Sequence, residues 1–221
     1  MKLTDEINAR PFKYGYYKHT FYSLFFPLYL VVFFFLEKLV PTLNEVDFII
    51  YHPLDDLIPF SEYFLIPYVF WYPFLFVPGI YLMMRDAKNF KKYMIFFAVV
   101  FFSASAIFFF FKNGQDLRPN YFQRDNAFVD VVKYLYSIDT NTNSLPSLHA
   151  AGSFIPFFAS LKCKCFKNTY LKIFFLISAL LISASTVFLK QHSILDTVAG
   201  IALAAIGFII VYIIPERMKK Q

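Results

Sequence analysis

The sequence predicts an all-α integral membrane protein: a bundle of six transmembrane helices with both termini cytoplasmic and a short amphipathic helix in an outer loop. Composition is the first observation, because 58% of the 221 residues are hydrophobic and 16% are charged, whereas soluble domains carry about 25% charged residues. The second is a set of six uncharged runs, and the third is an uneven distribution of lysine and arginine between the loops. Together they predict one membrane-embedded domain over residues 1–221.

Each uncharged run is close to the ~20 residues that a helix needs to cross a bilayer. The second run contains Pro67, Pro73 and Pro78, which predict a kinked helix. The six runs cover residues 19–36, 63–84, 93–111, 145–161, 173–189 and 197–215.

The basic residues predict the orientation, since lysine and arginine are enriched in cytoplasmic loops. Residues 1–20, 85–92, 162–172 and 216–221 hold four, four, four and three of the 21 basic residues, and all four segments fall on one side of a six-helix chain. The net charge of +6 therefore reflects topology and not nucleic-acid binding. We expect a multi-pass protein of the cell membrane, in contact with the lipid bilayer.

Residues 112–144 form a loop that is longer than a connection requires, and such loops tend to be functional. Asp125 or Asn126 can cap a helix in which Phe128, Val131, Val132 and Leu135 follow helical spacing. We expect this amphipathic helix to lie on the outer membrane surface.

The stretch from Ser185 to Asp196 places ionisable residues between two apolar runs. His192 and Asp196 are four residues apart, so the carboxylate can hold one imidazole nitrogen protonated and leave the other free to attack. Ionisable groups near a bilayer core cost about 3 kcal/mol or more, so they usually mark a site.

Three polar clusters are expected at the same membrane face: Lys112 with Arg118, Ser147 with His149, and Lys190 with His192 and Asp196. Cations and a helix N-terminus neutralise a phosphoryl group, one histidine attacks phosphorus, and the other protonates the departing oxygen. This set of residues therefore favours phosphoryl transfer.

No cofactor or metal is expected. Cys163 and Cys165 lie in a loop predicted to be cytoplasmic, where free thiols are expected and two sulfurs alone cannot complete a zinc site. Asp55 and Asp56 are best explained by an acidic outer loop, since no third ligand is spaced near them.

The order of the three clusters resembles the type 2 phosphatidic acid phosphatase family, whose members carry Lys…Arg-Pro, Pro-Ser-x-His and Ser-Arg-x5-His-x3-Asp motifs. Pro146-Ser-Leu-His149 fits the second motif, in a form similar to the inositol phosphorylceramide synthase-like bacterial branch. Ser185 to Asp196 fits the third. The resemblance covers about Lys112 to Gly200 in motifs, within a motif-bearing core of about residues 93–215.

The resemblance implies that His192 is the nucleophile of a phosphohistidine, that Asp196 orients it and that His149 is the general acid. Arg118, Ser147, Lys112 and Lys190 would bind the phosphate. Two departures affect these assignments. Five residues separate Lys112 from Arg118 where the family usually has six, and Thr186 stands where the third motif has arginine, a charge that Lys190 would replace.

Three functions remain open at this stage. The first is hydrolysis of a lipid phosphomonoester or pyrophosphate at the extracytoplasmic membrane face. The second is transfer of a phospho-headgroup to an alcohol acceptor, and the third is a non-catalytic transporter or scaffold for lipid phosphate. Phosphatidic acid, phosphatidylglycerol phosphate, polyprenyl pyrophosphate and sphingolipid or inositol lipids are all open as substrates, and the sequence does not fix an oligomeric state.

Overall fold

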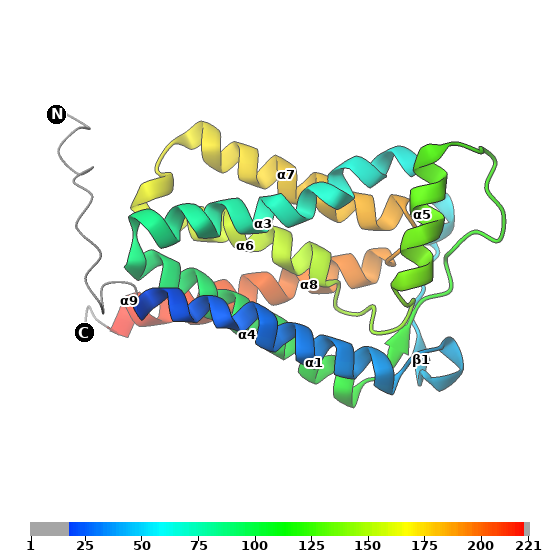
Figure 1. Cartoon of the computed structure of the whole chain (residues 1–221), viewed down its shortest axis with the longest axis horizontal. Helices are drawn as coiled ribbons and strands as arrows, with labels where there is room; N and C mark the ends of the chain where they lie inside the picture. Colours follow the sequence, from blue (N-terminus) through cyan, green and yellow to red (C-terminus); the bar gives the residue numbers. More distant parts are fainter. Residues whose placement is uncertain (1–17, 219–221) are drawn as a thin grey trace.

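The computed structural model describes residues 18–218, and its long helices run side by side (Figure 1). The predicted cytoplasmic termini fall largely on residues 1–17 and 219–221, outside the described residues. The long helices are α1 (Phe25–Leu39, preceded by the 3-10 segment Lys18–Leu24), α3 (Leu65–Arg85), α4 (Ala87–Phe110), α6 (Leu148–Lys162), α7 (Thr169–Phe188) and α8 (Ile194–Phe208, continued by a π-helical turn Ile209–Ile213 and α9, Ile214–Met218).

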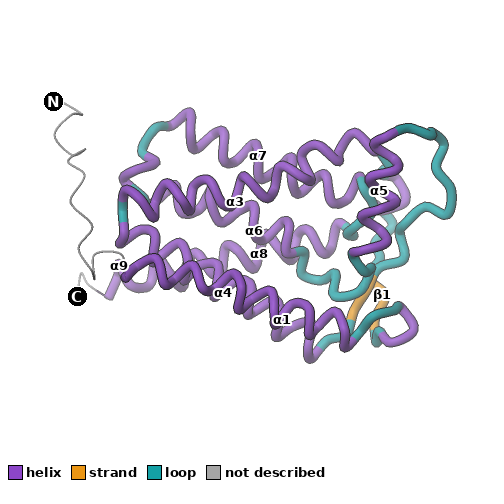
Figure 2. Tube along the Cα trace, in the orientation of Figure 1, coloured by secondary structure: helices purple, strands orange, loops and turns teal. Residues whose placement is uncertain are grey.

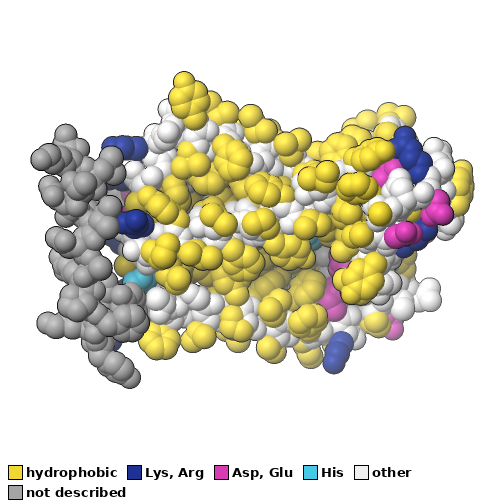
Figure 3. All heavy atoms as spheres, turned by 45° about the horizontal axis from the view of Figure 1, so that its top comes forward, with side chains coloured by type: hydrophobic (Ala, Val, Ile, Leu, Met, Phe, Trp, Pro, Cys, Tyr) yellow, Lys and Arg dark blue, Asp and Glu magenta, His cyan; other side chains and the backbone are white. Residues whose placement is uncertain are grey.

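Five helices are long and apolar enough to cross a membrane, searched over residues 18–218. They are Lys18–Leu39, Glu62–Arg85, Ala87–Phe110, Thr169–Phe188 and Ile194–Met218, and they coincide with five of the six predicted runs. Hydrophobic side chains cover the visible flank of the bundle, while charged side chains lie mainly near its two ends (Figure 3). The chain is therefore an all-α protein with the surface of a membrane protein.

The remaining predicted run, residues 145–161, forms α6, which is shorter than expected. It begins at Leu148 and has 15 residues, so it is about 22 Å long. The chain before it is irregular and is buried at Thr142, Asn143 and Ser144, with a positive φ of 53° at Asn143. Ser147 caps the helix by accepting the Ala150 N–H, which sets its first residue. Nearly all of α6 is enclosed by neighbouring helices, including α7 and α8.

Loops and short elements gather at one end of the bundle (Figure 2). A two-stranded parallel sheet joins β1 (Phe48–Ile49), which follows α1, to β2 (Asn113–Gly114), which follows α4. The short helix α2 (Leu54–Leu57), two single-turn 3-10 segments (Leu43–Glu45 and Glu62–Phe64) and α5 (Ala127–Ile138) complete this end. Figure 1 shows α5 standing across the ends of the long helices.

The predicted loop helix is present as α5, and Asn126 is its cap through a bond from the Val129 N–H to Oδ1 at 3.0 Å. Val129 and Val132 of this helix are buried against the protein, whereas Phe128 and Val131 are exposed. The helix turns this face toward the bundle because Tyr136, one turn beyond Val132, donates its hydroxyl to the Leu189 carbonyl.

Candidate functional site

The start of α8 fixes the first histidine. Ser193 caps the helix and Asp196, in its first turn, completes a capping box by accepting the Ser193 N–H at 2.9 Å. The same Asp196 oxygen lies 3.3 Å from Nδ1 of His192, the residue before the cap. Asp196 is fully buried, while His192 keeps a side-chain exposure of 13%. The carboxylate therefore orients the ring and leaves its Nε2 edge available.

The start of α6 supplies the second histidine. His149 follows the Ser147 cap and lies between two rings of α3, with centroid distances of 4.5 Å to Tyr68 and 4.4 Å to Trp71. Its ring centroid is 6.1 Å from that of His192. The two histidines, which are 43 positions apart in the sequence, therefore face one shared site.

Close packing of α6 on α8 brings the two helix starts together. The Ser147 N–H donates to the Asp196 carbonyl at 2.9 Å. A Cβ at Gly200 would lie 2.4 Å from the Ser147 carbonyl oxygen and 3.1 Å from the Ala151 nitrogen. Only glycine fits at this crossing without moving the backbone of one helix.

Arg118 reaches the same region from the loop after α4. Its guanidinium donates to the main-chain carbonyls of Tyr136, Asp139 and Thr140 at 2.9 to 3.1 Å, and to the Gln191 side chain at 2.8 Å. It also stacks on the Tyr136 ring, with Cζ 4.5 Å from the centroid. Burial lowers the pKa of Arg118 from its ordinary value. The end of α5 and Gln191, the residue before His192, therefore hold the Arg118 side chain.

Asp139 adds a buried carboxyl that sequence reasoning missed. Burial raises the pKa of this carboxyl, while the charges of His192 and Arg118 and a hydrogen bond from Tyr68 act in the opposite direction. An aspartate that ends an exposed amphipathic helix gives no sequence signal of such a role. Its position depends on how α5 docks.

Lys112 and Lys190, the two lysines predicted to bind phosphate, make other contacts. Lys190 has a positive φ of 53° and donates its ammonium to the Asp55 carbonyl at 2.6 Å. Burial lowers the pKa of Lys190. Lys112 is exposed beside Leu36 and Leu39 at the ends of α1 and α4, and its main-chain carbonyl accepts two N–H groups from the β1 region. Neither ammonium has a contact with the histidines among the interactions of residues 18–218.

Thr186, which stands in place of the third-motif arginine, has a main-chain role. Its carbonyl accepts the N–H groups of Gln191 and His192 at 2.9 and 3.1 Å. Its hydroxyl is buried and donates to the Ser183 carbonyl at 2.8 Å. Thr186 therefore closes the turn that carries His192, and no cation occupies its place.

Three amide or acid side chains brace the turns that carry the histidines, and sequence reasoning missed their roles. Asp55 accepts the Ser193 hydroxyl at 2.6 Å and the Ile194 N–H at 2.9 Å, so it binds the start of α8. Gln115 donates to the carbonyls of Lys190 and Gln191. Asn113 bonds both the N–H and the C=O of Leu145. The polar run Asn113-Gly-Gln115 directly after α4 is the sequence signal that could have indicated the roles of Asn113 and Gln115.

Several buried polar atoms around the histidines have no protein partner within residues 18–218. They include Nε of Arg118, Nε2 of Gln191, Nε2 of His149 and Oδ1 of Asp196. Buried polar groups are nearly always paired, so a group of unpaired ones at one place indicates a site for a polar ligand. The donors among them suit an anion with several oxygens, such as a phosphoryl group.

Fold and site together define a helical membrane protein in which a carboxylate-oriented histidine faces a second histidine beside an anchored arginine. A comparison with protein families matches the PAP2 superfamily over residues 92–220. The chain belongs to this superfamily, whose members are phosphatases or phosphotransferases that act on phosphate esters. Comparisons with curated proteins and with solved structures give no match.

Proposed function

We propose that the protein is a lipid phosphatase that hydrolyses a lipid phosphomonoester or pyrophosphate through a phosphohistidine on His192. One observation carries the proposal: Asp196 binds Nδ1 of His192, and the ring of His149 lies 6.1 Å from that of His192. A site that only binds phosphate needs cations, whereas an imidazole with an orienting carboxylate and a second imidazole beside it suits nucleophilic catalysis.

In the first step, Nε2 of His192 attacks phosphorus. The new N–P bond forms as the P–O bond to the lipid breaks, and His149 gives its proton to the departing lipid oxygen. The unpaired Nε2 of His149 supports this role. Asp196 holds the proton on Nδ1 of His192 and stabilises the positive charge that develops on the ring.

In the second step, water attacks the phosphohistidine. His149, now neutral, accepts a proton from the water, the N–P bond breaks, and inorganic phosphate leaves with His192 returned to its starting form. A general acid in one step serves as the general base in the next. The net reaction consumes one water for each lipid phosphate ester bond.

Arg118, Gln191 and Ser147 are the proposed phosphate-binding groups. The four hydrogen bonds of Arg118 fix its guanidinium, and Nε remains for a phosphoryl oxygen. Gln191 is bound to Arg118 through Oε1, and its Nε2 is unpaired. Oγ of Ser147 accepts the Ala150 N–H, which leaves its hydroxyl hydrogen to donate. Lys112 and Lys190 are not part of this proposed set, because their contacts lie elsewhere.

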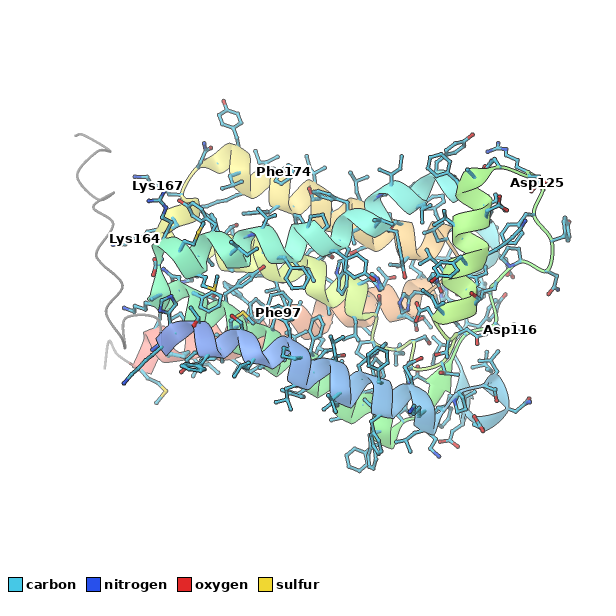
Figure 4. The ribbon with its side chains drawn as sticks, in the orientation of Figure 1. Phe97, Asp116, Asp125, Lys164, Lys167 and Phe174 are labelled. Atoms are coloured by element: carbon cyan, nitrogen blue, oxygen red, sulfur yellow. The ribbon has the colours of Figure 1, made fainter. Side chains whose placement is uncertain are left out.

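The proposed topology has six membrane passes, of which α6 is the fourth along the chain, and the histidines face the extracytoplasmic side. Lys164 and Lys167 lie at one end of the bundle, and Asp116 and Asp125, in the loop that carries Arg118, lie at the other (Figure 4). Since basic residues favour the cytoplasmic side, this distribution supports an outward-facing site. The irregular segment before α6 is buried at Thr142, Asn143 and Ser144, as non-helical backbone at membrane depth requires.

The decisive experiment is phosphate release by detergent-purified protein in EDTA, across a panel of lipid monophosphates and pyrophosphates. Wild type is compared with His192→Ala and with His52→Ala, a matched control whose histidine caps a loop through the Leu54 N–H. We expect release by wild type and His52→Ala, and a loss of at least about 10⁴-fold in His192→Ala.

Two results would count against the proposal. Release that His192→Ala retains would exclude this histidine as the nucleophile. If folded wild type releases no phosphate, the phosphatase proposal is wrong. Phosphodiester donors with alcohol acceptors would then test the phosphotransferase function suggested by the Pro-Ser-Leu-His sequence. Lipid-phosphate binding without either reaction would indicate a transporter or scaffold.

A further inference from the structure

A second cluster of reactive side chains lies far from the histidines. Cys163 follows the last residue of α6, Cys165 lies in the following single turn (Lys164–Phe166), and Asp86 joins α3 to α4. One ligand atom from each of the three lies within 4.8 Å of the others. Figure 4 shows Lys164, the residue between the two cysteines, at the end of the bundle opposite Asp116.

The spacing of these atoms suits tetrahedral coordination. Zinc binds thiolate sulfur at about 2.3 Å and carboxylate oxygen at about 2.0 Å, so two such ligands on a tetrahedron are about 3.5 Å apart. The sulfur of Cys165 is 3.4 Å from Oδ2 of Asp86. Because no pair exceeds 4.8 Å, a shift of roughly 1 Å brings all three atoms into bonding range.

Surrounding groups already orient the three ligands. The Phe166 N–H donates to the Cys163 carbonyl at 3.1 Å, which fixes the turn that carries both cysteines. Asn89 holds the Asp86 carboxylate through its main-chain N–H at 3.0 Å and its side-chain amide at 2.6 Å. These bonds fix the carboxylate while leaving lone pairs for a cation.

Ligand type and charge narrow the choice of ion. Two thiolates and one carboxylate carry three negative charges, so a divalent cation leaves a net charge of −1 at a place flanked by Lys164 and Lys167. Thiolates favour zinc and similar thiophilic ions over magnesium or calcium. Cys163 is buried and Cys165 is partly exposed, so an ion can reach the cluster from solvent through Cys165.

We propose that Asp86, Cys163 and Cys165 form a binding site for one thiophilic divalent cation of the zinc class, with water at the fourth position. Two sulfurs in a Cys-x-Cys sequence do not suffice for such a site, and the fold supplies the third ligand from a distant connection. The bound ion would tie the α3–α4 connection to the α6–α7 connection, at the end of α6 opposite His149.

Cobalt provides the test, because cobalt bound by thiolate has a sulfur-to-metal charge-transfer absorption. The chain contains two cysteines, so any such absorption must arise from this cluster. Reduced, metal-free protein in detergent is titrated with Co²⁺ and then with Zn²⁺. We expect one Co²⁺ per chain, a charge-transfer band, and its loss when Zn²⁺ displaces cobalt.

Variants separate the three ligands. Cys163→Ser and Cys165→Ser should abolish the band. Asp86→Asn leaves both thiols in place, and asparagine can still cap α4. This variant should bind cobalt about tenfold more weakly, or weaker still. Asp116→Asn, an exposed acid at the other end of the bundle, is the matched control and should bind as wild type does.

Thermal unfolding gives a readout that does not depend on a spectrum. Zinc should raise the Tm of wild type, since an ion that binds the folded state stabilises it, and should leave Cys165→Ser unchanged. The proposal is overturned if reduced wild type with two titratable thiols shows no charge-transfer band. Equal cobalt affinity in Asp86→Asn and wild type would also overturn it, because the carboxylate would then not be a ligand.

Discussion

The starts of α6 and α8 each carry a capping serine and a histidine, yet the two histidines have different surroundings. His192 precedes its cap, and a buried carboxylate binds its Nδ1 at 3.3 Å. His149 follows its cap, in the first helical turn, and lies between Tyr68 and Trp71. One ring is therefore held by a carboxylate, and the other by aromatic contacts at the start of a helix.

This difference suits the two histidines to the two proposed catalytic roles, nucleophile and general acid. The ring beside Asp196 is stabilised when it becomes positively charged, as a nucleophile does when it bonds to phosphorus. The ring of His149, 6.1 Å from that of His192, lies where it can give a proton to a leaving group. Two identical side chains thereby acquire the proposed nucleophile and acid roles from the elements on which they lie.

The strongest test of this contrast is His149→Ala, assayed on two substrates. A lipid phosphate with an alkyl leaving group should be hydrolysed about 10²- to 10⁴-fold more slowly, since general acid catalysis contributes that much. A nitrophenyl phosphate should lose far less in its first step, because its leaving group departs without a proton. Rates of alcohol or nitrophenol release measure both. An equal loss on the two substrates would contradict the acid role.

Asp196→Asn should also lower kcat, by about 10²- to 10⁴-fold, because an amide no longer fixes the tautomer of His192 or stabilises its positive charge. The asparagine can still accept the Ser193 N–H that Asp196 accepts at 2.9 Å, so the fold should persist. Turnover and circular dichroism are measured together. Wild-type kcat in this variant would show that His192 needs no orienting acid.

Gly200→Ala should disturb both helix starts together. The added Cβ would lie 2.4 Å from the Ser147 carbonyl oxygen, so α6 and α8 must separate, at a cost of about 1–3 kcal/mol in the free energy of unfolding. We expect a lower Tm and a lower kcat. Gly79→Ala, whose Cβ would meet the Tyr93 ring at 3.3 Å, is a milder control. A Gly200→Ala protein with unchanged Tm and kcat would show that this crossing tolerates separation.

The smallest expected effect concerns pH. Burial raises the folded-state pKa of Asp139 above its ordinary value of 3.8. As pH rises above 3.8, this carboxyl therefore keeps its proton longer in the folded chain than in the unfolded one. The free energy of unfolding falls with rising pH for that reason. Asp139→Asn removes this loss and keeps the carbonyl that Arg118 uses. Its Tm should exceed that of wild type at pH 7, and the difference should shrink toward about pH 4. A difference that is constant with pH would have another origin.

The sequence by itself determined the features that lie within one helix or one turn. Apolar runs long enough to span a bilayer predicted the long helices, because hydrophobicity and length are local properties. The four-residue spacing placed Asp196 beside His192, since one helical turn brings such positions together. Asp125 or Asn126 was predicted as a cap for the same local reason, and Asn126 is the cap. The motif order indicated the PAP2 superfamily, to which the chain belongs.

Only the tertiary structure decided what joins separate segments. The approach of His149 to His192 depends on the close crossing of α6 and α8 at Gly200. The ammonium of Lys190 goes to Asp55, because a positive φ redirects the turn before His192 and α2 packs against it. Asp86 meets Cys163 and Cys165 in the same way. Contacts between residues far apart in the chain depend on how the helices pack. The hydrophobic pattern and the residue spacing within one segment do not determine that packing.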